Sequence, residues 1–160
     1  IDNGYTEPDP REDLCGNDVG RKLLILAREL DLQNEFEEIA IQNLIPEHLR
    51  EGDVADFLNK LKEFDPIYDK IKAEQKPNHV LRYIGELSGD LQNDKGNLEV
   101  KLVSVPADTA LGGLKGSDSF FEIYTESYGD RPIVIQGAGA GSAVTARGVF
   151  GDILRLSDKG

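Results

Sequence analysis

A short stretch near the start of the chain gathers carboxylates ahead of one lysine. Residues 4–22 read GYTEPDPREDLCGNDVGRK, and their titratable side chains of interest are Glu7, Asp9, Glu12, Asp13, Asp18 and Lys22. Two prolines fix the backbone on either side of Asp9. Rigid loops that lead into helices are where binding groups collect. The pattern favours a pocket for a small substrate that carries an amino group.

The spacing of these groups suggests a proton transfer beside a bound ammonium. Glu7 and Asp13 suit an ammonium through charge-assisted hydrogen bonds. Lys22 suits proton transfer to and from a substrate oxygen, for which its pKa must fall through burial or a nearby cation. Asp18 precedes Lys22 by four residues on a predicted helix, so the two side chains share a face, and the charge of Asp18 opposes that fall. The alternative interpretation is a solvated acidic loop with a surface ion pair worth about 0.3–0.5 kcal/mol.

Length and charge bound the class of protein. A chain of 160 residues suits a single domain with one core. The formal net charge of -12 argues against nucleic acid as a partner, because phosphate contacts need clustered Lys and Arg. No apolar run approaches the ~20 residues of a membrane span, and no signal peptide is visible. We therefore expect no membrane partner and a cytoplasmic location.

Few side chains suit a metal or a disulfide. The single cysteine, Cys15, excludes an internal disulfide framework and a multi-cysteine metal site. His48 and His79 lie far apart in polar surroundings, which predicts surface positions and no metal site.

The apolar pattern predicts helices first and strands later. A helix capped by Asn17 carries an apolar stripe from Val19 to Leu30. The other predicted elements are a short strand within 39–45, a helix from Asp53 to Leu61, a short helix over 67–71, strands over 80–87, 98–105, 119–127 and 132–136, and a final helix over 142–156. Short loops between successive strands imply antiparallel neighbours.

A glycine motif, QGAGAG over residues 136–141, follows an apolar strand and opens the final helix. A dinucleotide-binding fingerprint requires a second parallel strand after that helix. The remaining residues are used by the helix alone, so the chain does not hold a complete nucleotide-binding unit here. The glycines indicate either close packing or an anion site at a helix N-terminus.

Residues 4–22 closely resemble the substrate and catalytic segment of homoserine dehydrogenases, whose usual form is GYTEPDPRDDL followed shortly by DVARK. The resemblance implies that Glu7 and Asp13 bind the substrate amino group. It implies that Asp18 and Lys22 serve hydride and proton transfer, and that Tyr5 lines the substrate site. Two departures from the family form touch no proposed catalytic group: the usual alanine is glycine at position 20, and a usual serine or asparagine is cysteine at position 15.

Residues 132–155 are similar to the end of homoserine dehydrogenases. The resemblance implies that the chain returns here to a nucleotide-binding domain, with Gly141 beside the cofactor, NADP or NAD. The final helix would dock on that domain and expose its apolar face within this chain. Residues 105–118 resemble the family segment VPxDxPLxxLKGxD, with Ala110 in place of the proline, and Lys115 is interpreted as a solvated loop lysine.

The resemblance implies an α+β fold, with helices on one face of a mostly antiparallel sheet that mediates a homodimer. Residues 1–160 would form one catalytic, substrate-binding and dimerisation domain. The chain begins with Ile1 and contains no methionine, so we expect a piece of a longer protein that lacks its nucleotide-binding domain, with room upstream for a fused aspartate kinase. The expected reaction interconverts aspartate 4-semialdehyde and homoserine, and the piece alone would be inactive.

Two other interpretations remain open. One is a non-catalytic amino-acid-binding or regulatory module, in which the acidic loop senses an ammonium and Lys22 has no chemical task. The other is a dimerisation scaffold with a solvated acidic loop, for which replacing Glu7 or Asp13 leaves ligand affinity unchanged.

Overall fold

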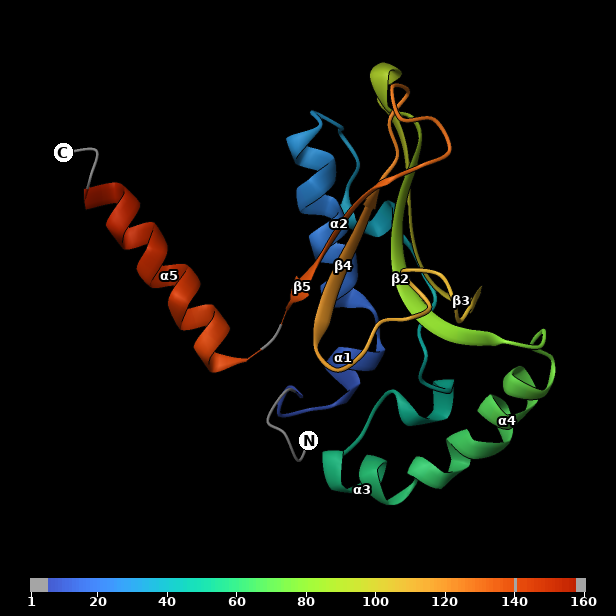
Figure 1. Ribbon diagram of the computed structural model, residues 1–160. Helices are drawn as coiled ribbons and strands as arrows, with labels where there is room; N and C mark the ends of the chain where they lie inside the picture. Colours follow the sequence, from blue (N-terminus) through green and yellow to red (C-terminus); the bar gives the residue numbers. More distant parts are fainter. Residues whose placement is uncertain (1–5, 140, 158–160) are drawn as a thin grey trace. The chain divides into compact units, whose positions relative to one another are not determined.

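The computed structural model describes residues 6–139 and 141–157. The chain forms two compact units, an N-terminal unit over Ile1–Asp108 and a C-terminal unit over Thr109–Gly160. Figure 1 traces both along the sequence. Among the described residues, no helix has both the length and the apolar character to cross a membrane.

The N-terminal unit contains a three-stranded sheet. Its strands are β1 (Ala40–Ile41), β2 (His79–Asp90) and β3 (Lys95–Pro106), in the order β1-β3-β2. Strands β2 and β3 form a long antiparallel hairpin through the 3-10 turn η4 (Leu91–Asn93), and β1 runs parallel to β3. The antiparallel pairing predicted for the successive strands over 80–87 and 98–105 is confirmed.

Helix α2 (Asn17–Glu29) covers one face of this sheet, and α1 (Arg11–Leu14) precedes it (Figure 1). The core between helix and sheet consists of Leu23, Ala27, Leu32, Ile39, Leu98 and Val100. Gly85 of β2 allows the close approach, because a Cβ there would lie 2.9 Å from Leu23 and 3.0 Å from Val19. The predicted helix is confirmed.

The predicted N-cap of this helix is wrong. Gly16, not Asn17, precedes the helix, with φ +85° and no side-chain cap. The short connection between α1 and α2 requires a left-handed residue, which glycine adopts at little cost. Asn17 is therefore already part of the helix.

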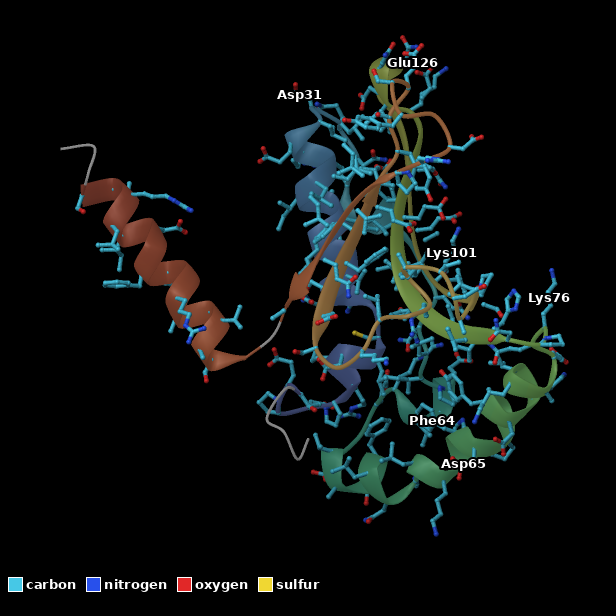
Figure 2. All side chains as sticks on the ribbon, viewed as in Figure 1. Asp31, Phe64, Asp65, Lys76, Lys101 and Glu126 are labelled. Carbon is cyan, nitrogen blue, oxygen red and sulfur yellow. The ribbon has the colours of Figure 1, made fainter. Side chains whose placement is uncertain are left out.

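A second apolar cluster, formed by Ile45, Leu49 and Phe57, organises the following segment. Its elements are η2 (Glu47–Leu49), α3 (Val54–Asn59), η3 (Leu61–Phe64) and α4 (Asp65–Ala73). The earlier 3-10 turn η1 (Phe36–Glu38) packs Phe36 against the first core. Asp53 caps α3 as predicted, accepting from the Ala55 N–H at 2.7 Å. The predicted strand over 39–45 shortens to β1 because Ile45 joins this second cluster. Figure 2 labels Phe64, which stacks with Tyr68 at a centroid distance of 6.1 Å, and Asp65 at the start of α4.

The C-terminal unit consists of a hairpin and a helix. Strands β4 (Asp118–Ile123) and β5 (Ile133–Ala138) pair antiparallel, and α5 (Ser142–Ser157) follows. Three apolar side chains of α5 that share a helix face, Val149, Ile153 and Leu156, are 56%, 56% and 73% exposed. The exposed apolar face predicted for this helix is confirmed. The α+β class is also confirmed, although the strands form two separate sheets.

Candidate active site

The acidic loop runs from Thr6 into α1 and closes on itself through Asp13. The backbone N–H of Glu7 donates to Oδ2 of Asp13 at 3.1 Å. Both side chains are exposed. The structure therefore brings together the two residues predicted to hold an ammonium, and it leaves their carboxylates reachable from solvent.

Arg11 anchors the middle of the acidic loop. Its Nε and Nη2 contact the Asp9 carboxylate at 3.0 and 2.7 Å, and Nη2 also donates to the Gly52 carbonyl at 3.0 Å. The guanidinium carbon lies 5.5 Å from the centre of the Phe57 ring. Hydrogen bonding from Arg11 lowers the pKa of the Asp9 carboxyl below its ordinary value, so Asp9 stays ionised in this pair.

The connection from α1 to α2 is fixed from the side of β1. The Leu14 carbonyl accepts from the Leu44 N–H at 3.1 Å. The Tyr83 hydroxyl donates to the Gln42 carbonyl at 2.7 Å and lies against Gly16, where an added Cβ would overlap it. Burial raises the pKa of Tyr83 to about 12, so the hydroxyl keeps its proton.

Asp18 and Lys22 form an ion pair on the first turns of α2. Oδ2 of Asp18 lies 2.7 Å from Nζ of Lys22, and the two side chains are 61% and 71% exposed. The shared helix face predicted from their spacing is confirmed. A pair this exposed contributes little to stability, so it leaves both charges free to respond to a ligand.

An open cleft of about 460 Å³ lies beside the acidic loop. Its lining includes Asp9, Arg11 and Cys15, together with Arg50 and Gly52. None of the four site residues predicted from residues 7–22 lies among its lining.

The glycine motif separates into two kinds of position. Gly139 packs against Ser119, whose side chain would overlap an added Cβ, and its N–H donates to the Ser117 carbonyl at 2.9 Å. Gly141 has φ +123° and no atom within 4 Å of an added Cβ. Close packing therefore explains Gly139, whereas Gly141 has the open surroundings and backbone freedom that let a ligand approach closely.

The remaining predicted residues have simpler surroundings. Tyr5 lies outside the described residues. His48 is exposed and lies 2.7 Å from Glu63, and Lys115 is exposed, as predicted. His79 is half-buried, with its ring nitrogen 3.0 Å from the Pro77 carbonyl. Within residues 6–139 and 141–157, no three His, Cys, Asp or Glu side chains gather in a way that could hold a metal ion.

Sequence reasoning missed the contacts that hold the site. Arg11 stands among acids in the sequence, yet its Gly52 partner is 41 positions away. Tyr83 likewise reaches Gln42 across 41 positions. The one local signal was the position of the arginine, two residues after Asp9. Two prolines stand just before it and two further acids just after it.

The acidic loop and the helix with Asp18 and Lys22 lie in the N-terminal unit of an α+β chain, and the glycine turn lies in the C-terminal unit. The profile of the homoserine dehydrogenase family matches residues 1–154. The chain belongs to the homoserine dehydrogenase family.

Curated relatives support this assignment and extend beyond the chain. A homoserine dehydrogenase of Paracoccidioides brasiliensis is 42% identical over 161 residues, which cover 99% of this chain and 42% of the relative. Bifunctional aspartokinase/homoserine dehydrogenase 1, chloroplastic, of Zea mays is 44% identical over 156 residues, which cover 96% of this chain and 16% of the relative. The chain thus spans less than half of either relative.

Solved structures agree on the fold. A Candida auris protein described as of unknown function superposes with a TM-score of 0.79 at 39% identity, covering 98% of this chain and 43% of its own. Homoserine dehydrogenase of S. aureus superposes with a TM-score of 0.61 at 18% identity, covering 98% of this chain and 34% of its own. At that identity the second likeness concerns the fold alone.

Proposed function

We propose that this chain is the substrate-binding and catalytic part of a homoserine dehydrogenase, which interconverts aspartate 4-semialdehyde and L-homoserine. The observation that carries the proposal is the acidic loop of a family member, closed by the Glu7–Asp13 hydrogen bond and followed directly by the Asp18–Lys22 pair. Two carboxylates for an amino group and one lysine for an oxygen match a small amino alcohol.

Glu7 and Asp13 bind the substrate ammonium in this proposal. An ionised carboxylate offers about four lone-pair positions, and the Glu7 N–H uses only one of those on Asp13. Charge-assisted hydrogen bonds from an ammonium are stronger than those from water. The two carboxylates therefore orient the substrate by its amino end.

Lys22 transfers the proton at the substrate oxygen. In the oxidation of homoserine it accepts the hydroxyl proton, and in the reverse direction it returns this proton. Because Oδ2 of Asp18 lies 2.7 Å from Nζ of Lys22, we propose that Asp18 turns towards the substrate ammonium when Lys22 acts on the substrate oxygen. Binding of the substrate then both orients the alcohol and releases Lys22 from its partner.

The nicotinamide cofactor, NADP or NAD, supplies or accepts hydride when bound. Of the residues here, Gly141 is the one we propose lies beside it, supported by its φ of +123° and its open surroundings. The other cofactor contacts would belong to a nucleotide-binding domain outside these 160 residues. The exposed apolar face of α5 is suited to dock on that domain. Tyr5 would line the substrate site.

We further propose that the protein is a cytoplasmic homodimer formed through the sheet. In the described three-stranded sheet, β2 is a strand of twelve residues at the end of the order β1-β3-β2. A long strand at the edge of a sheet favours pairing with another chain. Sedimentation of the protein that contains these residues tests for the dimer.

Lys22 provides the test of the reaction. The polypeptide that joins these residues to a nucleotide-binding domain is assayed for homoserine-dependent reduction of NADP and NAD. We expect wild-type turnover, and a fall in kcat of about 10²-fold or more for Lys22→Ala, because general acid–base groups contribute on that scale. Arg21→Ala, which removes the neighbouring exposed cation on α2, is the matched control and should leave kcat unchanged.

Two results would overturn the proposal. Turnover in Lys22→Ala equal to that in wild type would remove Lys22 from the chemistry. Homoserine binding without any wild-type turnover would instead indicate an amino-acid-sensing module.

A further inference from the structure

We propose that Arg11 is a positioning residue for the substrate ammonium, acting through the shape of the acidic loop. Resting on the proposed function, this adds a residue to the same site. Arg11 would hold the loop so that Glu7 and Asp13 stay together, without itself contacting substrate.

The contacts of Arg11 hold its guanidinium in one position and one orientation. Two nitrogens meet the two oxygens of Asp9, and one of these nitrogens also reaches the Gly52 carbonyl. The side chain is only 12% exposed. A planar guanidinium held on two sides has few alternative rotamers, whereas the ammonium of a lysine would keep one of these contacts at a time.

The Arg11 guanidinium also contacts the second apolar cluster. The guanidinium sits over the ring of Phe57, which is 2% exposed and packs with Ile45 and Leu49. A cation over an aromatic face is attracted to it, and more so away from water. Arg11 therefore ties the acidic loop to the second apolar cluster.

A series of hydrogen bonds connects Arg11 to Asp13 and Glu7, the residues proposed to bind the substrate ammonium. The Asp9 carboxylate accepts from the Arg11 N–H at 3.0 Å, and the Asp9 carbonyl accepts from the Glu12 N–H at 3.0 Å. Helix α1 is a single turn, so Asp13 moves with Arg11. Asp13 in turn holds the Glu7 N–H.

The same contacts divide the acids of the loop by role. Both carboxylate oxygens of Asp9 accept hydrogen bonds from Arg11, and the negative charge of Asp9 is cancelled by the positive charge of Arg11. The other acids of the stretch, Glu7, Glu12 and Asp13, keep their charges uncancelled, and Glu7 and Asp13 are the two joined by a hydrogen bond. Without Arg11, Asp9 would become a further acceptor, and the substrate could bind in more than one orientation.

Steady-state kinetics of Arg11→Lys test this role in the polypeptide that includes the nucleotide-binding domain. We expect the KM for homoserine to rise about 10-fold or more, with kcat changed much less and the KM for the cofactor unchanged. Arg28→Lys is the matched control, because Arg28 also joins a carbonyl, Leu32, to a carboxylate, Glu35, far from the acidic loop. It should leave the KM for homoserine unchanged.

A double-mutant cycle separates positioning from general stability. If Arg11 acts through Glu7, the effects of Arg11→Lys and Glu7→Gln on the KM for homoserine are less than additive. Asp9→Asn, which leaves Arg11 its Gly52 and Phe57 contacts, should also raise this KM and serves if Arg11→Lys does not fold.

The outcomes are distinguishable from failure of the proposed function. Wild-type turnover of homoserine establishes the reaction whatever Arg11 does. With turnover present, an unchanged homoserine KM in Arg11→Lys or, failing its folding, in Asp9→Asn overturns the positioning role alone. An equal rise in Arg28→Lys, or strict additivity with Glu7→Gln, overturns it too. No turnover in wild type overturns the proposed function and this inference with it.

Discussion

The Tyr83 hydroxyl lies against Gly16, at the residue where the chain turns from the acidic loop into α2. It donates to the Gln42 carbonyl at 2.7 Å, so strand β2, the segment after β1 and the start of α2 meet at one point. The direction in which α2 leaves the loop is set there. The placement of Asp18 and Lys22 thus depends on a residue more than sixty positions away in the sequence.

Gly16→Ala should destabilise the N-terminal unit by about 2 kcal/mol or more. The change adds a methyl group at φ +85° and forces it into Tyr83. Urea unfolding followed by circular dichroism measures the loss. Gly52→Ala, at φ +100° with nothing within 4 Å, is the matched control and should show the smaller cost of backbone strain alone. Equal losses in both variants would refute a role for Tyr83.

Alkaline pH should weaken the fold through Tyr83. Its pKa is raised from 10.0 to about 12 in the folded chain, so folding favours the protonated hydroxyl. This contribution is fully present below pH 10 and is lost as the pH rises through about 12, because the unfolded tyrosine ionises first. Tyr83→Phe should flatten the fall in unfolding free energy over that window. The exposed Tyr128→Phe should not, and an unchanged slope in Tyr83→Phe would contradict the assignment.

Removing either proposed ammonium ligand should weaken homoserine binding. For Glu7→Gln and Asp13→Asn we expect the KM for homoserine to rise by about 10-fold or more, with the cofactor KM unchanged. Asp13→Asn should have the larger effect, because it also weakens the contact with the Glu7 N–H. Glu12→Gln neutralises the neighbouring acid of α1 and is the control. An equal effect at Glu12 would point to general electrostatic attraction in place of a defined pair.

Replacing Gly20 with the alanine usual in the family should help stability only when space is made. Alanine gains about 1 kcal/mol of helix propensity. A Cβ at this position would lie 3.0 Å from Cδ1 of Ile41 and 3.2 Å from Cε2 of Phe36, which is crowded. We expect Gly20→Ala to be nearly neutral alone and stabilising when added to Ile41→Val, measured by unfolding. A full gain from the single change would show that Ile41 and Phe36 shift freely.

The order of helices and strands was largely predictable, because it depends on local signals. The Asp53 cap and the turn before Lys95 lie within a few residues of what they organise. The N-cap at Asn17 failed because the short connection between α1 and α2 places a left-handed residue at Gly16, directly before the helix. The strand over 39–45 was overextended because Ile45 belongs to another cluster, which periodicity alone does not reveal.

The charged groups proposed for the site follow from the sequence alone, whereas the contacts that support them do not. Glu7, Asp13, Asp18 and Lys22 lie in one continuous stretch whose spacing resembles a family motif. Arg11 makes its contact with Gly52 across a long loop, and no local pattern encodes that pairing. Where the charges sit can thus be inferred from neighbours in sequence, whereas what holds them still requires the fold.

The compactness of this stretch has a consequence for engineering substrate preference. All four proposed chemical groups could be exchanged as one cassette between family members. The transplanted segment would carry its charged side chains, but not the residues outside it that it contacts, namely Gly52, Phe57 and Tyr83. The transplanted segment should therefore keep its substrate selectivity only in a host protein that has matching residues at those three positions.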